Sequence, residues 1–192
     1  MNDKSTMETL RIKEIHNFIS SKLKDVISER YFNHEILSEA DLQSNIWQLL
    51  FDFFRVNEKR ELFTIHCNLY LKELRTHPDL VIFKNGKPYI IIELKEWRSI
   101  DLNKWSSSKK KKAADKDIKR LLDAENHFFE KHRVKRGYFM YVSWKPVVIQ
   151  DEGIQGKNSR FLSVIRFVNE GVTFDKKWKE EFIKRSKYIA EP

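Results

Sequence analysis

Two short apolar segments separated by an Asn-Gly pair constrain the fold of this chain more than any other feature. Residues 80–83 and 89–92 are apolar at every position, and Asn85-Gly86 lies between them. An Asn-Gly pair flanked by apolar segments is a strong signal for a tight β-hairpin. Strands that are apolar on both sides need cover on both faces, so we expect this hairpin inside a sheet rather than at its edge.

The remaining pattern predicts helices before and after this hairpin. Apolar residues recur at helical spacing between residues 12 and 27, and a second helix is expected to begin at Ser38. An alternating stretch at 63–70 predicts a half-buried strand. A basic helix at 109–132, strands at 137–144 and 161–168, and a helix at 178–189 follow. The order helix, three strands, helix, strand predicts an α/β fold with helices on both faces of a mixed sheet.

Three charged side chains lie where the hairpin would open. Asp79 precedes its first strand, and Glu93 and Lys95 end its second strand, two residues apart and therefore on one face. A two-residue Asn85-Gly86 loop would place Asp79 and Glu93 on opposite faces, whereas an odd-numbered loop would place them together. We therefore expect an odd-numbered loop, or a β-bulge near the open end of the hairpin.

Two carboxylates that meet beside an apolar core need a compensating charge at neutral pH. Magnesium can supply it, because Mg²⁺ takes oxygen ligands and keeps several waters, so that one or two protein carboxylates suffice. Bound Mg²⁺, with Mn²⁺ as a substitute, could polarise a phosphate ester and lower the pKa of a water molecule. The Lys95 ammonium could orient that water or stabilise the charge that builds on phosphorus. The pattern predicts metal-assisted hydrolysis of a phosphodiester.

The motif Pro78-Asp79, followed after a hairpin by Glu93-Leu94-Lys95, resembles that of the PD-(D/E)xK nuclease superfamily. That family has the restriction-endonuclease-like fold, a mixed sheet with an αβββαβ core, which residues 38–144 resemble in their predicted order of elements. The resemblance implies that Asp79, Glu93 and the carbonyl of Leu94 hold the metal, and that Lys95 serves the nucleophile. We expect an endonuclease that cuts DNA, with RNA as the open alternative.

Members of that family often add an acidic residue from the helix before the sheet. Glu39 precedes Leu42 by three residues and Ile46 by seven, so it shares their buried helix face. Asp41 falls on a polar face, so we expect it to cap the helix. Glu39 is therefore the expected further ligand of the metal or of its water, and Gln43, four residues later, could reach the same cleft.

The distribution of positive charge predicts which residues would contact nucleic acid. The net charge is +9, which attracts polyanions. The helix expected at 109–132 begins with four lysines, whose charge opposes the helix dipole unless a phosphate backbone lies nearby. Ser143 and Lys145, after a later strand, are further candidate phosphate contacts. The residues expected to bind nucleic acid are Arg98, Lys104, Lys109, Lys112, Lys116 and Arg120.

Composition and length exclude several other classes of protein. A single cysteine, Cys67, excludes an intramolecular disulfide and a cysteine-based zinc site. No segment approaches the roughly 20 apolar residues of a membrane span, and the N-terminus lacks a secretory signal, so we expect a cytoplasmic protein without membrane contact. The 192 residues fit one domain, with an N-terminal helical extension at 1–37, a catalytic core at 38–144 and a C-terminal strand and helix at 145–192. A homodimer stays open, since cutting both DNA strands calls for two active sites.

Other interpretations of the same residues compete with the nuclease. In the simplest, Asp79 caps a turn, and Glu93 and Lys95 form a salt bridge at a sheet edge; the apolar run up to Ile92 argues against an exposed edge. A second alternative is a catalytically inactive nucleic-acid-binding module on the same fold. A third is an interaction module that docks a partner through its Phe-rich helices.

Overall fold

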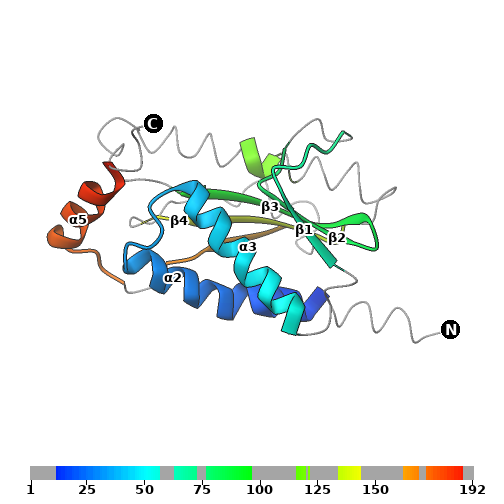
Figure 1. The fold of residues 1–192 in the computed structure, drawn as a ribbon, viewed down its shortest axis with the longest axis horizontal. Helices are drawn as coiled ribbons and strands as arrows, with labels where there is room; N and C mark the ends of the chain where they lie inside the picture. The colour runs from blue at the N-terminus through cyan, green and yellow to red at the C-terminus, as the bar shows by residue number, and fades with distance from the viewer. Residues whose placement is uncertain are drawn as a thin grey trace.

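The structure, a computed structural model, describes residues 12–56, 63–72, 77–96, 116–119, 121, 134–143, 162–168 and 172–187. Five strands in these ranges form one mixed sheet in sequence order: β1 (Phe63–Cys67), β2 (Leu80–Lys84), β3 (Lys87–Glu96), β4 (Arg136–Val142) and β5 (Leu162–Arg166) (Figure 1). The pairs β1–β2 and β2–β3 are antiparallel, and β3–β4 and β4–β5 are parallel. The expected mixed sheet is confirmed, and both hairpin strands are internal.

Helices cover both faces of this sheet. One face packs against α3 (Glu39–Val56), α2 (Lys24–Phe32), η1 (Ile19–Leu23) and α5 (Lys176–Lys187), which share one core with alternate residues of β2, β3 and β4. On the other face, Ile118 and Leu121 of a short helical segment pack against Val81, Ile91 and Phe139. Figure 1 shows α2 and α3 on one side of the strands and this short segment on the other. No helix within the described ranges has the length and apolar character needed to cross a bilayer.

The N-terminal helices belong to the main core. Ile15, Ile19, Leu23, Ile27 and Tyr31 are all fully buried there. This stripe advances four residues at each step, slightly more than the 3.6 residues of an α-helical turn. The wider π-helical turn of η1 compensates for that difference, so that all five side chains lie in the main core.

The start of α3 is fixed by a reciprocal cap. The Ser38 hydroxyl accepts a hydrogen bond from the Asp41 N–H at 3.0 Å, and the Asp41 carboxylate accepts one from the Leu37 N–H at 3.0 Å. The expected role of Asp41 as a helix cap is confirmed. Such a cap is worth about 1 kcal/mol, and it leaves Glu39 in the first helical turn, within reach of Lys95 near the end of β3.

The hairpin loop has an even number of residues, whereas one of our two expectations was an odd-numbered loop. Asn85 and Gly86 form a two-residue turn, with φ angles of 52° and 72°. These left-handed values are those that the tight primed hairpin turns require, which explains the Asn-Gly pair. The expectation of an odd-numbered loop is wrong, so the register has to be corrected within the strands.

A β-bulge in the middle of the hairpin makes that correction. Ile82 lies opposite Ile90, whereas Phe83 lies opposite Pro88, which leaves Tyr89 as the extra residue on β3. Pro88 has no N–H to donate to the ladder, so regular pairing is weakest beside it. The expected bulge is confirmed, but it lies nearer the turn than the open end, where we had placed it.

Candidate functional site

The acidic pair, Asp79 and Glu93, meets where β2 and β3 separate. Beyond the bulge Leu80 lies opposite Ile92, so one step further Asp79 lies opposite Glu93 on the same face. The two carboxyl groups are close enough to influence each other's protonation, and Glu93 is only 2 % exposed. Two carboxylates are both acceptors, so this contact needs a shared proton or a cation. The expected convergence of the two residues is confirmed.

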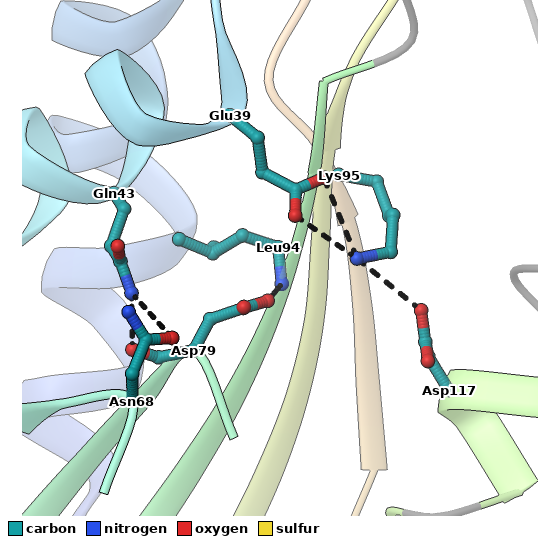
Figure 2. A network of polar contacts seen from close by, with 7 residues as sticks. All are labelled: Glu39, Gln43, Asn68, Asp79, Leu94, Lys95 and Asp117. Carbon is teal, nitrogen blue, oxygen red and sulfur yellow. Dashed lines mark hydrogen bonds and ion pairs between the residues drawn. The ribbon is translucent and has the colours of Figure 1, made fainter. Parts of the chain in front are cut away.

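Asp79 is held by the backbone around it. Its carboxylate accepts a hydrogen bond from the Leu94 N–H at 2.6 Å (Figure 2). Its carbonyl accepts hydrogen bonds from the Asn68 N–H at 3.1 Å and from the Gln43 side-chain amide. Asn68, just past β1, has a φ of 49°, a left-handed value that asparagine tolerates. Gln43 therefore reaches the site, as expected, by orienting the backbone of Asp79.

The lysine cluster consists of Lys95, Glu39 and Asp117, which come from three different elements. The Lys95 ammonium lies 3.3 Å from the nearer Glu39 carboxylate oxygen and 3.4 Å from the Asp117 carboxylate. Figure 2 shows it between Glu39 of α3 and Asp117 of the short helical segment. An exposed salt bridge at a sheet edge is excluded, because β3 is internal and Glu93 is buried.

Asp117 is the site residue that the sequence analysis missed. It was passed over as one charge among many in the basic helix expected at 109–132. Its helical phase could have revealed it, because it directly precedes Ile118 and lies four residues before Leu121, both buried. A carboxylate on the buried side of a basic helix calls for a partner, and that partner is Lys95.

Burial dominates the electrostatics of the acidic side chains. It raises the pKa of the Asp79 carboxyl above its ordinary value, and the negative charge of Asp117 adds to this, although the Leu94 N–H and the Lys95 ammonium oppose it. Burial also raises the pKa of Glu39, against the opposing effect of Lys95. Both shifts follow mainly from burial, which disfavours the charged form of a carboxyl group, and the neighbouring Lys95 offsets them only in part.

The same surroundings have the opposite effect on Lys95. Burial by itself lowers the pKa of its ammonium, but the carboxylates of Glu39, Asp79 and Asp117 outweigh burial, and the net shift is upward. Lys95 is therefore firmly protonated at neutral pH. It acts as a cation and a hydrogen-bond donor, and it is not a base.

The oxygen donors of the acidic pair suit a hard divalent cation. Among the described residues, no group of three or more His, Cys, Asp and Glu side chains is in a position to hold one ion. Glu39, expected as a further ligand, has the Lys95 ammonium as its immediate partner. Asp79 and Glu93 are the two described side chains whose oxygens could hold such an ion together, and two carboxylates are enough for Mg²⁺ because this ion retains most of its waters.

The expected nucleic-acid contacts are mostly beyond the described ranges. Lys116 is described and is exposed, directly beside Asp117. Ser143 is 1 % exposed, so the expectation that its side chain contacts a phosphate is not supported. The other candidates lie outside the described residues: Arg98, Lys104, Lys109, Lys112, Arg120 and Lys145.

The chain was compared with protein families, curated proteins and solved structures. No protein-family model matches the chain, and neither a curated protein nor a solved structure matches it.

Proposed function

We propose that this chain is a magnesium-dependent nuclease that hydrolyses phosphodiester bonds of DNA as an endonuclease. The observation that carries the proposal is the acidic pair: the strand register brings the carboxyl groups of Asp79 and Glu93 together at the open end of the β2–β3 hairpin. Lys95, two residues beyond Glu93, adds a protonated ammonium that interacts with Asp79. Buried carboxylates that share a site with one lysine are suited to hydrolysis of a phosphate ester.

The arrangement of elements supports a restriction-endonuclease-like fold and membership of the PD-(D/E)xK superfamily. α3 precedes three antiparallel strands, a helical segment packs on the opposite face, and β4 then pairs in parallel with β3. This is the αβββαβ order that the motif's resemblance implies. Of the motif residues, Asp79 directly precedes β2, and Glu93 and Lys95 lie near the end of β3.

The residues that would hold the metal are Asp79, Glu93 and the backbone carbonyl of Leu94. In a hydrogen-bonded strand position the N–H and the carbonyl of one residue face the same neighbour. The Leu94 N–H contacts Asp79, so its carbonyl is expected to face the same gap beyond β2. When bound, Mg²⁺ would offset the charge of the acidic pair, polarise the phosphate and lower the pKa of a coordinated water.

Lys95 can contribute hydrogen bonds and positive charge to the reaction. Its ammonium has three N–H donors, and two carboxylates, those of Glu39 and Asp117, are within reach of them. The third donor can bind the attacking water or a phosphate oxygen. In the hydrolysis the water oxygen forms a bond to phosphorus, one P–O ester bond breaks, and the departing sugar oxygen takes up a proton. Positive charge next to phosphorus stabilises the transition state of this exchange.

The test is a cleavage panel of plasmid, linear duplex, single-stranded DNA and RNA, with Mg²⁺ or with chelator. We expect products from DNA only with Mg²⁺ or Mn²⁺, and none from Asp79→Ala. Asp52→Ala is the matched control, because Asp52 pairs with exposed Arg55 near the far end of α3. Parent protein that binds DNA without cutting it under any of these conditions would instead be a catalytically inactive binding module. Cleavage by Asp79→Ala at the parent's rate would overturn the assigned site.

A further inference from the structure

Asp117 and Glu39 hold the Lys95 ammonium from opposite faces of the sheet, but they differ in how firmly they are fixed. The Asp117 side chain is 6 % exposed, whereas that of Glu39 is 45 % exposed. Ile118 and Leu121, on the same short helical segment as Asp117, are buried in the second core cluster. Asp117 is therefore the rigid partner of Lys95, and Glu39 is the partner that solvent or substrate can reach.

A lysine side chain is difficult to hold in one place. Its flexible four-carbon stem loses rotamer entropy when it is fixed. Lys95 is itself only 21 % exposed, so its stem is confined and the position of the ammonium depends on the groups that contact it. A buried carboxylate at 3.4 Å is the contact best able to fix it.

We propose that Asp117 is a positioning residue, which fixes the Lys95 ammonium beside the acidic pair and leaves one N–H donor for the attacking water or the phosphate. This inference rests on the nuclease function proposed above. It assigns Asp117 a role through Lys95 rather than a contact with the metal. The 3.4 Å ion pair favours that role, since the carboxylate already has a cation as its partner.

The experiment compares Asp117→Asn and Asp117→Glu with the parent in initial-rate assays over a range of Mg²⁺ concentrations. Mutation of a residue that orients a functional side chain without touching the substrate typically lowers activity by about 10–100-fold. We expect Asp117→Asn to lower kcat by about that factor, with unchanged KM for DNA and an unchanged Mg²⁺ requirement. Asp117→Glu keeps the charge and is expected to recover part of the rate. Asp52→Asn, the same substitution in an ion pair remote from the site, should leave the rate unchanged.

A second readout does not depend on cleavage. The rate at which an amine-directed acylating reagent modifies Lys95, measured by peptide mass spectrometry, should rise several-fold in Asp117→Asn, because the amine loses its fixed partner. Melting temperatures of the variants show whether the fold is kept.

The outcomes separate this inference from the function on which it rests. Parent-like kcat and labelling in Asp117→Asn would overturn the inference alone. A raised Mg²⁺ requirement, with full kcat at saturating metal, would also overturn it, because Asp117 would then be a metal ligand. A parent that never cuts would end the nuclease proposal and the catalytic role of Asp117, whereas increased labelling would still establish the contact with Lys95.

Discussion

The acidic pair and the lysine cluster are neighbours at the C-terminal end of the internal strand β3, but they differ in how their buried charges are stabilised. In the lysine cluster an ammonium lies within 3.4 Å of two carboxylates that come from opposite faces. In the acidic pair, two carboxyl groups contact each other, and Asp79 is further held by a neutral backbone N–H. The cluster contains its own cation, whereas the contact between two carboxyl groups in the pair calls for a shared proton or a bound cation.

For the proposed nuclease, this difference makes the lysine cluster the structural part of the site and the acidic pair the part that would bind the metal. Together the two groups place three carboxylates, those of Glu39, Asp79 and Asp117, near one ammonium, which leaves an excess of negative charge. Burial is the largest cause of the raised pKa values of Asp79 and Glu39. A divalent cation at the acidic pair would remove most of that excess negative charge. Loss of a charge should therefore have opposite effects on stability in the two groups, and this contrast can be tested.

The largest expected effect is on cleavage and comes from the acidic pair. Glu93→Gln keeps the shape of the side chain and removes its charge, and we expect the rate of DNA cleavage at saturating Mg²⁺ to fall on the order of 1,000-fold. The metal-free protein should be as stable as the parent or more stable, because a buried like charge is gone. Glu181→Gln, in an exposed helical ion pair with Arg185, is the control. A cleavage rate within threefold of the parent would remove Glu93 from the site.

The next largest effect is on stability and comes from the lysine cluster. Lys95→Ala leaves Asp117 buried without its cation, so we expect the free energy of unfolding to fall by roughly 3 kcal/mol, in addition to the loss of cleavage. Urea denaturation without metal measures this. Lys176→Ala, which breaks an exposed ion pair with Glu180, should cost less than about 1 kcal/mol. If Lys95→Ala is no less stable than Lys176→Ala, the lysine cluster is not the compensated group that its geometry indicates.

The sequence predicted the acidic pair better than it predicted the lysine cluster, for a physical reason. Asp79, Glu93 and Lys95 flank one hairpin, so the alternation of side chains along a strand determines which face they share. The bulge at Ile82 and Phe83 was also foreseeable, because a two-residue turn alone would have separated the carboxyl groups. The position of the bulge could not be predicted, because neither the alternation of side chains nor the turn type indicates where a strand gains a residue.

Asp117 was harder to predict because it is distant in sequence from the lysine that it contacts. Local periodicity shows which face of a helix is buried, but it does not show which side chain of another element that face meets. The crossover from β3 to β4 brings Asp117 to Lys95, and this pairing depends on how the short helical segment sits on the sheet. Contacts of this kind depend on how whole elements pack together, and no single local pattern in the sequence reveals them.

A smaller effect should follow from binding of the metal. If the acidic pair lacks a cation, Mg²⁺ at ten times its dissociation constant should raise the free energy of unfolding by about 1.4 kcal/mol. Asp79→Asn should abolish that increase, while Asp52→Asn should keep it, because Asp52 already pairs with Arg55. Thermal or urea unfolding with and without Mg²⁺ measures the difference. Equal stabilisation of the parent and Asp79→Asn would mean that the ion binds elsewhere.

The smallest expected effect is on the pH dependence of stability. It tests most directly whether the acidic pair, unlike the lysine cluster, lacks a compensating cation. Burial raises the pKa of Asp79 in the folded protein above its ordinary value. A carboxyl group with a raised pKa favours the folded state while it is protonated, and this contribution is lost as the pH rises from below the ordinary value through the raised one. The metal-free parent should therefore lose stability relative to Asp79→Asn between about pH 4 and neutral pH, whereas the two should be alike in acid.

Urea denaturation of both proteins across that range, with chelator present, measures the difference. Asp79→Asn also removes a negative charge that raises the pKa of Glu39. The loss of the Asp79 carboxyl and the smaller pKa shift of Glu39 therefore both favour the variant over the parent as the pH rises. Added Mg²⁺ should reverse the trend for the parent alone, because the cation stabilises the ionised pair. If the parent instead gained stability relative to Asp79→Asn as the pH rose without metal, Asp79 would already be compensated within the fold. The acidic pair would then be a second structural cluster, with no need for a metal ion.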